Sequence, residues 1–579
     1  MPRHSSALLR ARVYENKWLT IKFLQEEREI EEGQAAQGRR AAAMNIATDE
    51  YGNPFLIVRE QQQKQRLQGQ AAHRANILAA CAVADTLRSS LGPKGMDKVI
   101  VGSDGQITVT NDGATILSKM NVEHQCARLL VELSQSQDAE IGDGTTGVVV
   151  LAGALLTKAL HLLEKGLHPL RIADGFEKAS QIAVARLEEI VLRKDVYGAD
   201  RDLLVHAAST ALGSKVVSSQ QRHLAEICVQ AVLSVADRER GDVNFDLIKV
   251  DGKAGALLEE TRLLQGVVLH KEMSHSQMKK EIKDAKIAIL TCPFEPPKPK
   301  TKHKLDIRSV EDYKKLQVAE QKYFSDMVKK VKDAGANVVI CQWGFDDEAN
   351  HLLLHENLPA IRWVGGAELE MVAIATGGRI VPRWEELSAE KLGSAAAVRE
   401  ISSGTMGDKF VVIEGCGNNA KAVTVVVCAG NQMLVAEAER CMHDALCVVR
   451  NLLRDPRVVG GGGAAELCAA VAVDAAADQI AGVEQFSVRA FADALTSVAE
   501  ALADNCGLHA IEEVQKVKSL QVTQNYPYFG VDCMQKGTRD MLKQNVLESF
   551  SSKVNQILLA AQVVKMILKI DDVIVPNDI

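Results

Sequence analysis

The stretch Gly142–Leu155 reads GDGTTGVVVLAGAL, and it is the most informative part of the chain for the fold. Three glycines and an aspartate lead into small and apolar residues, which predicts a loop that opens a long, buried helix. The first amide groups of a helix, together with its dipole, favour an anion. Mg²⁺ prefers carboxylate and phosphate oxygens, and Asp143 supplies such a carboxylate. The segment is therefore chemically complete as a cradle for a magnesium-bound phosphate.

Two other interpretations of the same residues stay open at this point. Gly142–Gly147 matches GxGxxG, the pattern of dinucleotide-binding folds. That pattern needs a strand before it and an acid after a second strand, whereas an amphipathic helix is predicted before it here. The other alternative is a plain loop-to-helix junction in which the aspartate is only a cap. No GxxxxGK[ST] sequence occurs in the chain.

Three further glycine-containing junctions next to helix ends offer either free backbone amides or an acid. They are Leu91–Gly95 (LGPKG), Thr110–Thr115 (TNDGAT) and Gly460–Ala464 (GGGGA). Each is more often ordinary turn chemistry than a site, but four such junctions together are more suggestive than one. Asp444 adds an acid on an apolar helix, where the alternative is a solvated side chain on the helix face.

Composition limits the class of protein. The chain has 579 residues, of which 47% are hydrophobic and 25% charged, and its net charge is −7 (68 basic minus 75 acidic residues). This is ordinary globular composition, and the length predicts about three or four domains. The chain has no excess of basic residues that could bind the phosphates of a nucleic acid, and only 4% of its residues are aromatic. A nucleic-acid binder is therefore not expected.

Cysteine usage and apolar runs exclude further classes. The 12 cysteines include no CxxC pair, which argues against a zinc site or redox dithiol and predicts free thiols in a reducing compartment. The longest apolar runs, such as Gly147–Leu156, are about ten residues, short of a membrane span. No secretory signal is visible.

The first half of the chain is predicted to be mainly helical after an unusual start. Residues 1–43 hold a basic stretch and a mixed-charge run, and we interpret them as a disordered or non-native extension. The later elements are a helix over Gln70–Ser90, two short strands, a helix broken near Asn121, and the long helix after Gly147. The strands are expected at Lys98–Val101 and Ile107–Thr110, and the broken helix runs from about Ala114 to Gln137.

The middle of the chain predicts an α/β domain, because buried strands alternate with helices. The expected strands are Ala285–Cys292, Ala336–Gln342, Pro359–Val364 and Arg379–Pro382, and the expected helices are Val310–Ala334 and Asp346–Glu356. The Pro- and Lys-rich segment Pro293–Lys304 must protrude, since it has nothing apolar to bury. From Glu437 to about Gln521 the pattern is helical again, which suggests one discontinuous helical domain with the middle inserted.

Five segments together identify a resemblance to the group II chaperonins. They are Leu91–Lys98 (LGPKGMDK), Thr110–Leu117 (TNDGATIL), Gly142–Leu155, Arg489–Leu495 (RAFADAL) and Leu568–Ile574 (LKIDDVI). The resemblance runs from about Asp49 to Ile574. Three more segments resemble one subunit class of the eukaryotic cytosolic chaperonin: Cys292–Leu305, Gln342–Leu354 and Ala373–Pro382.

The resemblance implies a multidomain α+β fold with three named parts. A mainly helical, discontinuous equatorial domain would take residues 44–198 and 461–579. A small intermediate hinge domain would take 199–268 and 429–460, and an α/β apical domain would take 269–428, with a helical protrusion near 293–320. Residues 1–43 have no counterpart in the family.

The resemblance also implies a site for ATP or ADP with Mg²⁺. Asp143 would hold the metal, Asp444 would orient or deprotonate the attacking water, and Asp112 would assist. The expected nucleotide-binding residues are Leu91, Gly92, Pro93, Gly113, Gly144, Thr145, Thr146, Ser214, Lys215, Gly461, Gly462, Asp532 and Glu548. Val427–Asn431 departs from the family, which usually has Arg-Gly at Cys428 and Ala429.

The implied function is ATP-dependent folding of cytosolic proteins, such as actin and tubulin, in a cytoplasmic double ring. Each ring would hold eight paralogous subunits, and hydrolysis would close the chamber on partly folded clients; no nucleic acid or membrane partner is implied. The polar face of Asp346–Glu356 could bind clients, or the helix could simply pack its leucines in the core. The alternative function is a structural or adaptor subunit of the same fold that does not hydrolyse ATP.

Overall fold

The computed structural model describes residues 44–48, 54–58, 69–102, 105–195, 201–237, 239–295, 307, 309–403, 408–416 and 422–573. It divides into two units, of which the larger comprises Gln68–Val573. In the smaller unit, β1 (Met44–Thr48) pairs with β2 (Pro54–Val58) in antiparallel register. The extension predicted for residues 1–43 lies outside the described residues.

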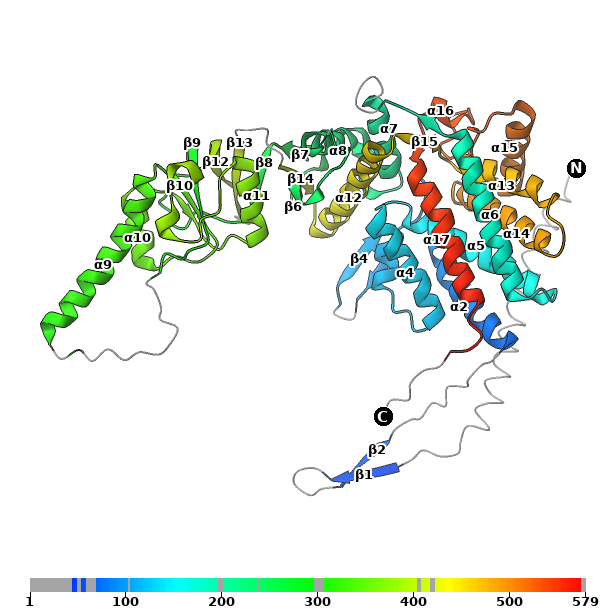
Figure 1. The fold of residues 1–579 in the computed structure, drawn as a ribbon, viewed down its shortest axis with the longest axis horizontal. Helices are drawn as coiled ribbons and strands as arrows, with labels where there is room; N and C mark the ends of the chain where they lie inside the picture. Colours follow the sequence, from blue (N-terminus) through cyan, green and yellow to red (C-terminus); the bar gives the residue numbers. More distant parts are fainter. Residues whose placement is uncertain are drawn as a thin grey trace, which may run out of the picture. The chain divides into compact units, whose positions relative to one another are not determined.

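The largest hydrophobic core is built by helices from both ends of the chain. Their apolar residues recur at helical spacing and meet in one cluster, and α5, α6, α14 and α17 lie side by side there (Figure 1). The helices are α2 (Gln70–Arg88), α3 (Gly113–Lys119), α4 (Gln125–Glu140), α5 (Thr145–Glu164), α6 (Pro169–Ile190), α13 (Ala464–Ala477), α14 (Glu484–Asn505) and α17 (Phe550–Leu568). The predicted joining of the two chain ends is therefore seen in the packing.

The predicted local elements of this region are confirmed. The helix over Gln70–Ser90 is α2, the interruption near Asn121 separates α3 from α4, and the two strands are β3 (Lys98–Val101) and β4 (Ile107–Thr110). The helix expected from Glu437 begins earlier, at Gln432. It begins there because the Asn431 side chain accepts a hydrogen bond from the amide of Leu434 at 2.8 Å and so caps the helix.

Helix α5 is the one helix among the described residues that is long and apolar enough to span a membrane by length and composition. The expectation that the chain has no segment of that kind was therefore wrong. Its interior-facing residues, such as Leu155 and Leu156, are fully buried among the neighbouring helices. Packing of this kind accounts for its apolar sequence as the central helix of a protein core.

A second core joins α7 (Arg201–Leu212), α8 (Gln221–Val235) and α12 (Gln432–Arg454) to a small sheet. In that sheet β14 (Val423–Ala429) lies between parallel β6 (Ile248–Ala254) and antiparallel β7 (Arg262–Leu264). A further sheet has the order β16 (Leu547–Ser549), β15 (Arg457–Gly460), β5 (Leu192–Arg193). Strand β15 lies between α12 and α13, just before the glycine junction that was expected to begin a new helix, and α15 (Ala510–Gln524) and α16 (Met541–Gln544) follow later.

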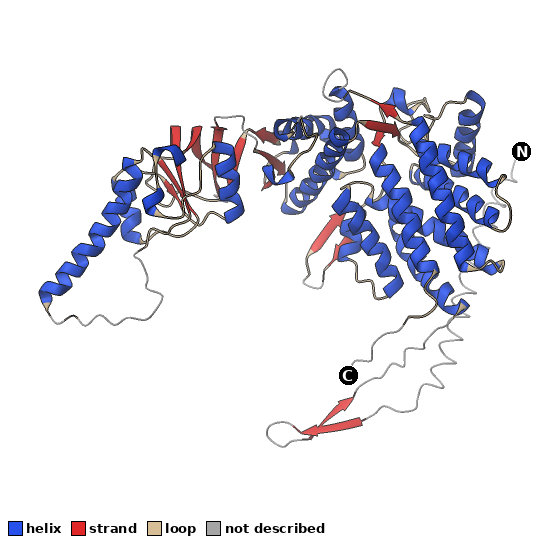
Figure 2. Cartoon of the chain, viewed as in Figure 1, coloured by secondary structure: helices blue, strands red, loops and turns tan. Residues whose placement is uncertain are grey.

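The third core surrounds a mixed six-stranded sheet of order β11-β10-β9-β12-β13-β8 (Figure 2). The predicted strands form its parallel half: β9 (Glu281–Leu290), β10 (Val338–Cys341) and β11 (Ala360–Ile361). The other half is antiparallel and was not predicted: β12 (Gly393–Ser403), β13 (Asp408–Cys416) and β8 (Gly266–Leu269). The helices of this part are α9 (Val310–Asp333), α10 (Asp347–His355) and α11 (Gly366–Thr376).

Three predictions for this part of the chain need comment. Arg379–Pro382 is not a strand and forms only one isolated bridge, Val381 to Leu290, because Pro382 has no amide hydrogen to extend a ladder. In α10, Leu353 is fully buried and its two neighbours are half-buried. The leucines therefore pack against the core, which was one of the two interpretations of this helix. Of the predicted protrusion near 293–320, residues 296–306 and 308 lie outside the described residues, and 310–320 belong to α9.

All twelve cysteines are described, and each is a free thiol. Eleven of them are buried, as free cysteines commonly are.

Candidate nucleotide site

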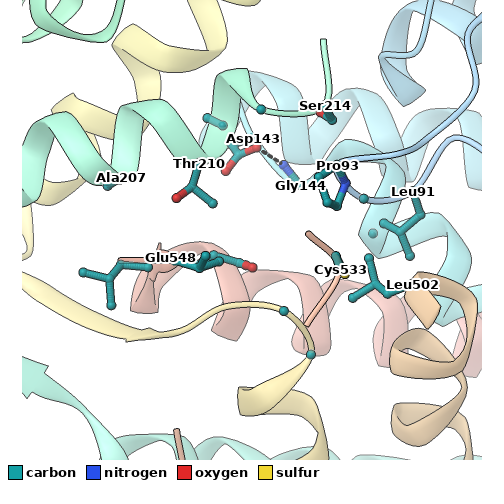
Figure 3. Close-up of a pocket in the computed structure, with 18 of the residues that line it drawn as sticks. Leu91, Pro93, Asp143, Gly144, Ala207, Thr210, Ser214, Leu502, Cys533 and Glu548 are labelled. Carbon is teal, nitrogen blue, oxygen red and sulfur yellow. Dashed lines mark hydrogen bonds between the residues drawn. The ribbon is translucent and has the colours of Figure 1, made fainter. Parts of the chain in front are cut away.

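A cavity of about 560 Å³ lies where the first and second cores meet. Segments that are far apart in the sequence line it: the ends of α2 and β4, the start of α5, α7, α12, the start of α13, the stretch 531–549 and α17. Figure 3 shows Asp143, Thr210 and Ser214 on one side of the cavity and Glu548, Cys533 and Leu502 across from them. Its volume lies in the range of small-molecule sites.

The start of α5 forms one wall of this cavity. Gly144 occupies the N-cap with φ 77°, a left-handed conformation that favours glycine. The Asp143 carboxylate accepts a hydrogen bond from the Gly144 amide at 2.8 Å, as the dashed line in Figure 3 shows. The Gln137 side chain holds the Asp143 carbonyl at 2.8 Å. The loop is thereby fixed, with the amide end of a twenty-residue helix turned to the cavity.

Asp112 ties this loop to the next one. It caps α3, and its Oδ2 accepts hydrogen bonds from the Thr115 amide (3.0 Å) and hydroxyl (2.7 Å). Its Oδ1 accepts the hydroxyl of Thr145 at 2.9 Å. Burial alone would raise the pKa of Asp112, but Lys215 and these hydrogen bonds outweigh it and lower the pKa, so the carboxylate stays ionised.

Asp444 projects from α12 into the same cavity and forms an ion pair with Lys215. The two side chains are only 15% and 8% exposed, so the solvated alternative for Asp444 is excluded. Burial raises the pKa of the Asp444 carboxyl to about 7; the charges of Asp112 and Asp143 add to this rise, and Lys215 opposes it. A carboxyl that titrates near neutral pH is suited to general-base work.

Two hydrogen bonds bring these segments together. Asn111 donates to the carbonyl of Ser214 at 2.6 Å, which joins the β4–α3 loop to the loop that carries Lys215. The Thr110 hydroxyl donates to the buried Glu437 carboxylate at 3.0 Å, which joins β4 to α12. The position of Asp444 therefore depends on contacts between residues 103 and 327 positions apart in the sequence.

The donor set fits a magnesium-bound phosphate group. Burial raises the pKa of Asp143 above its ordinary value, and a bound cation would favour its ionised form. No group of three or more His, Cys, Asp or Glu side chains that could hold a metal ion occurs among the described residues. Mg²⁺ is commonly held by one or two carboxylates together with phosphate oxygens and water. A single carboxylate in the cavity wall, that of Asp143, is therefore enough to hold it.

Most of the residues expected at the site line the cavity. They are Leu91, Gly92, Pro93, Asp112, Asp143, Gly144, Thr145, Thr146, Ser214, Lys215, Asp444, Gly462 and Glu548. Two others lie just behind the wall: Gly113 against Thr146, and Gly461 against Glu548. Asp532 does not line the cavity, because its carboxylate accepts hydrogen bonds from Lys536, Gly537 and Gln544 and so closes its own loop.

Several polar residues of the cavity were not predicted from the sequence. Helix α17 contributes Lys553 and Gln556, α13 contributes Glu466, and α7 contributes Thr210. Polar residues lie at 549, the N-cap of α17, and within α17 at 552, 553 and 556; the pairs 549/553, 552/556 and 553/556 are three or four positions apart and so share one face of the helix. That spacing was the available signal, although it also fits an exposed face.

Comparison with known proteins finds one family over most of the chain. The family model for the TCP-1/cpn60 chaperonin family matches residues 83–578. T-complex protein 1 subunit epsilon of Encephalitozoon cuniculi is 46% identical over 533 residues, which cover 92% of this chain and 99% of that protein.

Two archaeal proteins are similar over nearly the same length. A thermosome subunit of Methanocaldococcus jannaschii is 40% identical over 523 residues, 90% of this chain and 95% of its own. Thermosome subunit alpha of Aeropyrum pernix is 41% identical over 529 residues, 90% of this chain and 94% of its own.

Proposed function

Because the chain belongs to the TCP-1/cpn60 chaperonin family, we propose that it is an ATP-hydrolysing subunit of a double-ring chaperonin. We assign it to the epsilon class, which Cys292–Leu305, Gln342–Leu354 and Ala373–Pro382 resemble. The observation that carries the proposal is that Asp112, Asp143 and Asp444 line one cavity together with the amide end of α5.

The chemistry follows from what each residue offers. Phosphoryl transfer to water needs positioning and charge neutralisation more than covalent chemistry. Mg²⁺, held by Asp143, supplies charge neutralisation when bound. Gly144 and Thr146 present amide and hydroxyl donors at the start of α5, where the phosphates would lie. Asp444 accepts the proton of the attacking water, and Asp112 keeps the α5 loop in place through Thr145.

The ammonium group of Lys215 has two possible partners, the Asp444 carboxylate and a nucleotide phosphate. In this structure its ammonium group pairs with Asp444 and is also close to Asp112. A nucleotide phosphate would compete for the same cation. The rest of the nucleotide, beyond its phosphates, would lie against other residues of the cavity wall: Leu91, Gly92, Pro93, Ser214, Gly462 and Glu548.

We assign the parts of the chain accordingly. Residues 44–198 and 461–579 form the equatorial domain, residues 199–268 and 429–460 the intermediate domain, and residues 269–428 the apical domain. In a cytoplasmic double ring of eight subunits each, the apical domains would hold partly folded clients such as actin and tubulin. The polar face of Asp346–Glu356 is one candidate surface, since Leu353 points into the core.

The proposal predicts a large particle that turns over ATP. Sixteen subunits near the 62.8 kDa of this chain give about 1 MDa. We expect light scattering of particles purified through a tag on this chain to report that mass with and without Mg-ATP, and phosphate release to require Mg²⁺. A mass near that of the monomer under all conditions would contradict the proposal. An intact particle in which this subunit retains its bound triphosphate would instead support the adaptor function.

A further inference from the structure

Two cysteines from different segments of the chain meet beside the nucleotide cavity. Cys506 is the C-cap of α14, and Cys533 lies in the stretch 531–549 and lines the cavity. The Cys533 thiol donates a hydrogen bond to the sulfur of Cys506. The two residues are 6% and 7% exposed and belong to one hydrophobic cluster. The lack of a CxxC pair excludes a dithiol between close neighbours in the chain, whereas this pair is formed by folding.

The backbone around the cavity holds the 531–549 stretch against α14. Val531 donates its amide hydrogen to the carbonyl of Gly462 at 2.9 Å, which ties this stretch to the glycine turn before α13. A Cβ on Gly463 would lie 3.0 Å from the Cβ of Ala499, so the same turn packs directly on α14. Cys533 follows Val531 by two residues and is therefore held near the same helix.

The end of α14 forms part of the cavity wall. Leu502, one helical turn before Cys506, lines the cavity with Cys533, and Figure 3 shows both side chains on the same side of it. A Cβ on Gly92 would lie 2.6 Å from Cδ2 of Leu502, so the turn after α2 has no spare room against α14. A shift of Cys533 or of the end of α14 would therefore change the shape of the cavity.

The surroundings favour the thiolate of Cys506. The hydrogen bond from Cys533 lowers the pKa of the Cys506 thiol, burial opposes this, and the positive charge of Lys94 adds to the lowering. The same hydrogen bond and burial raise the pKa of Cys533. Redox-sensing cysteines commonly combine a thiol of lowered pKa with a second cysteine that resolves its oxidised form. Disulfides of this kind are transient in a reducing compartment.

We propose that Cys506 and Cys533 are a dithiol that hydrogen peroxide oxidises to a disulfide, and that this oxidation opposes nucleotide binding in the cavity. The Cys506 thiolate attacks one peroxide oxygen and the O–O bond breaks, which gives a sulfenic acid and a hydroxide that is protonated to water. The Cys533 sulfur then attacks the sulfenic sulfur, the S–O bond breaks, and hydroxide leaves with the Cys533 proton as a second water. Two thiols are oxidised by two electrons, and one peroxide is reduced.

Oxidation and nucleotide binding oppose each other for a geometric reason. A disulfide holds its sulfur atoms about 2.0 Å apart, closer than two hydrogen-bonded thiols. Cys533 or the end of α14 must therefore move, and both contribute to the wall that a nucleotide would contact. By linkage, a bound nucleotide must disfavour the disulfide by the same factor. This opposition rests on the proposed function of the cavity, whereas the disulfide itself does not.

The first measurement is peptide mapping of the assembled particle after treatment with hydrogen peroxide and blocking of the remaining thiols. Trypsin releases Cys506 in residues 490–516 and Cys533 in residues 519–536, and neither peptide holds another cysteine. We expect the two peptides to be joined, lighter than their sum by two hydrogen atoms, and to separate after treatment with dithiothreitol. If no joined peptide forms, the inference is wrong whether or not the particle binds nucleotide.

The second measurement compares nucleotide affinity before and after oxidation. Competition by ATP against photolabelling of this chain with 8-azido-ATP should weaken about tenfold on oxidation, as expected for a distorted cavity wall. The affinity should recover after dithiothreitol. In a glutathione redox buffer, saturating Mg-ADP should lower the ratio of disulfide to dithiol about tenfold. Equal affinity in the oxidised and reduced particle would overturn the opposition.

Two cysteine variants provide the matched comparison. Cys506→Ser should leave ATP affinity of the reduced particle unchanged, because Cys506 does not line the cavity, and should abolish the response to peroxide. Cys506→Ala should do the same and checks that the new hydroxyl is not the cause. Cys81→Ser removes the one cysteine that is not buried, which lies outside the cavity, and should leave the response intact.

The outcomes separate this inference from the proposed function. If the reduced, unmodified chain is not photolabelled, the proposed nucleotide site and the opposition are both wrong, and peptide mapping still decides whether the disulfide forms. If peroxide weakens ATP binding equally in Cys506→Ser and in the unmodified chain, another oxidation is responsible and the inference is overturned. Loss of the response in Cys81→Ser alone would overturn it as well.

Discussion

Replacing Asp444 by alanine should slow ATP hydrolysis at this subunit by about 10²- to 10⁴-fold, the usual contribution of a general base. ATP should still bind, since the start of α5 and the cavity wall around Leu91–Pro93 remain intact. Hydrolysis should be slowed because the Asp444 carboxyl is buried in the cavity beside Lys215 and its pKa is raised to about 7.

The measurement must be specific to this subunit within the particle. After photolabelling with 8-azido-ATP, the ratio of γ- to α-phosphate label on this chain reports how much triphosphate survives. The ratio should stay high in Asp444→Ala. Asp493→Ala, which removes an exposed acid of α14 that pairs with Lys158, serves as the matched control and should hydrolyse normally. Equal loss of γ-label in both variants would show that Asp444 has no part in hydrolysis.

Replacing Gly113 by alanine should weaken nucleotide binding by roughly 5- to 150-fold, which corresponds to an overpacking cost of about 1–3 kcal/mol. A Cβ at this position would lie 2.8 Å from the amide nitrogen of Thr146 and 2.9 Å from its Cα. Since both are backbone atoms, the α5 loop itself must move. Alanine is the better helix former, so any loss comes from this collision rather than from α3.

The control for this variant is Gly430→Ala. No atom lies within 4 Å of a Cβ at Gly430, so ATP affinity should be unchanged there. Equilibrium binding of ATP to particles carrying each variant, with thermal melting to check folding, gives the comparison. Wild-type affinity in Gly113→Ala would mean that the contact between the α3 and α5 loops does not shape the site.

The sequence predicted the elements whose signals are local. The glycines and Thr145 before an apolar run predicted the start of α5, and Gly92-Pro93 predicted the end of α2. The joining of the two chain ends followed from the order of helical and α/β segments. Local signals of this kind predict structure well, because a turn residue or a cap acts on residues only a few positions away in the sequence.

What could not be predicted depends on partners distant in sequence. Nothing near Asp444 in the chain reveals that Lys215 neutralises it, so a solvated helix face was an equally sound interpretation. Lys553 and Glu466 are 87 positions apart and meet only once α13 and α17 pack together. Asp532 stays a prediction: its carboxylate accepts hydrogen bonds within its own loop, while its neighbours Val531 and Cys533 line the cavity.

The antiparallel half of the six-stranded sheet was missed for a related reason. Strand–helix alternation reveals parallel strands, as in β9, β10 and β11. In contrast, only four residues separate β12 from β13 in the sequence, and no helix lies between β8 and β9 among the described residues. The alternation was therefore informative about half of the sheet and silent about the rest.

The central claim is that three distant carboxylates meet around one magnesium-bound triphosphate. A structure of the assembled particle with Mg²⁺, ADP and aluminium fluoride tests it most directly. We predict the metal at about 2.0–2.1 Å from Asp143 and the Asp444 carboxylate about 2.6–3.2 Å from an in-line water. Nucleotide density outside the cavity, or Asp444 tens of ångströms from the nucleotide in the closed particle, would contradict the claim.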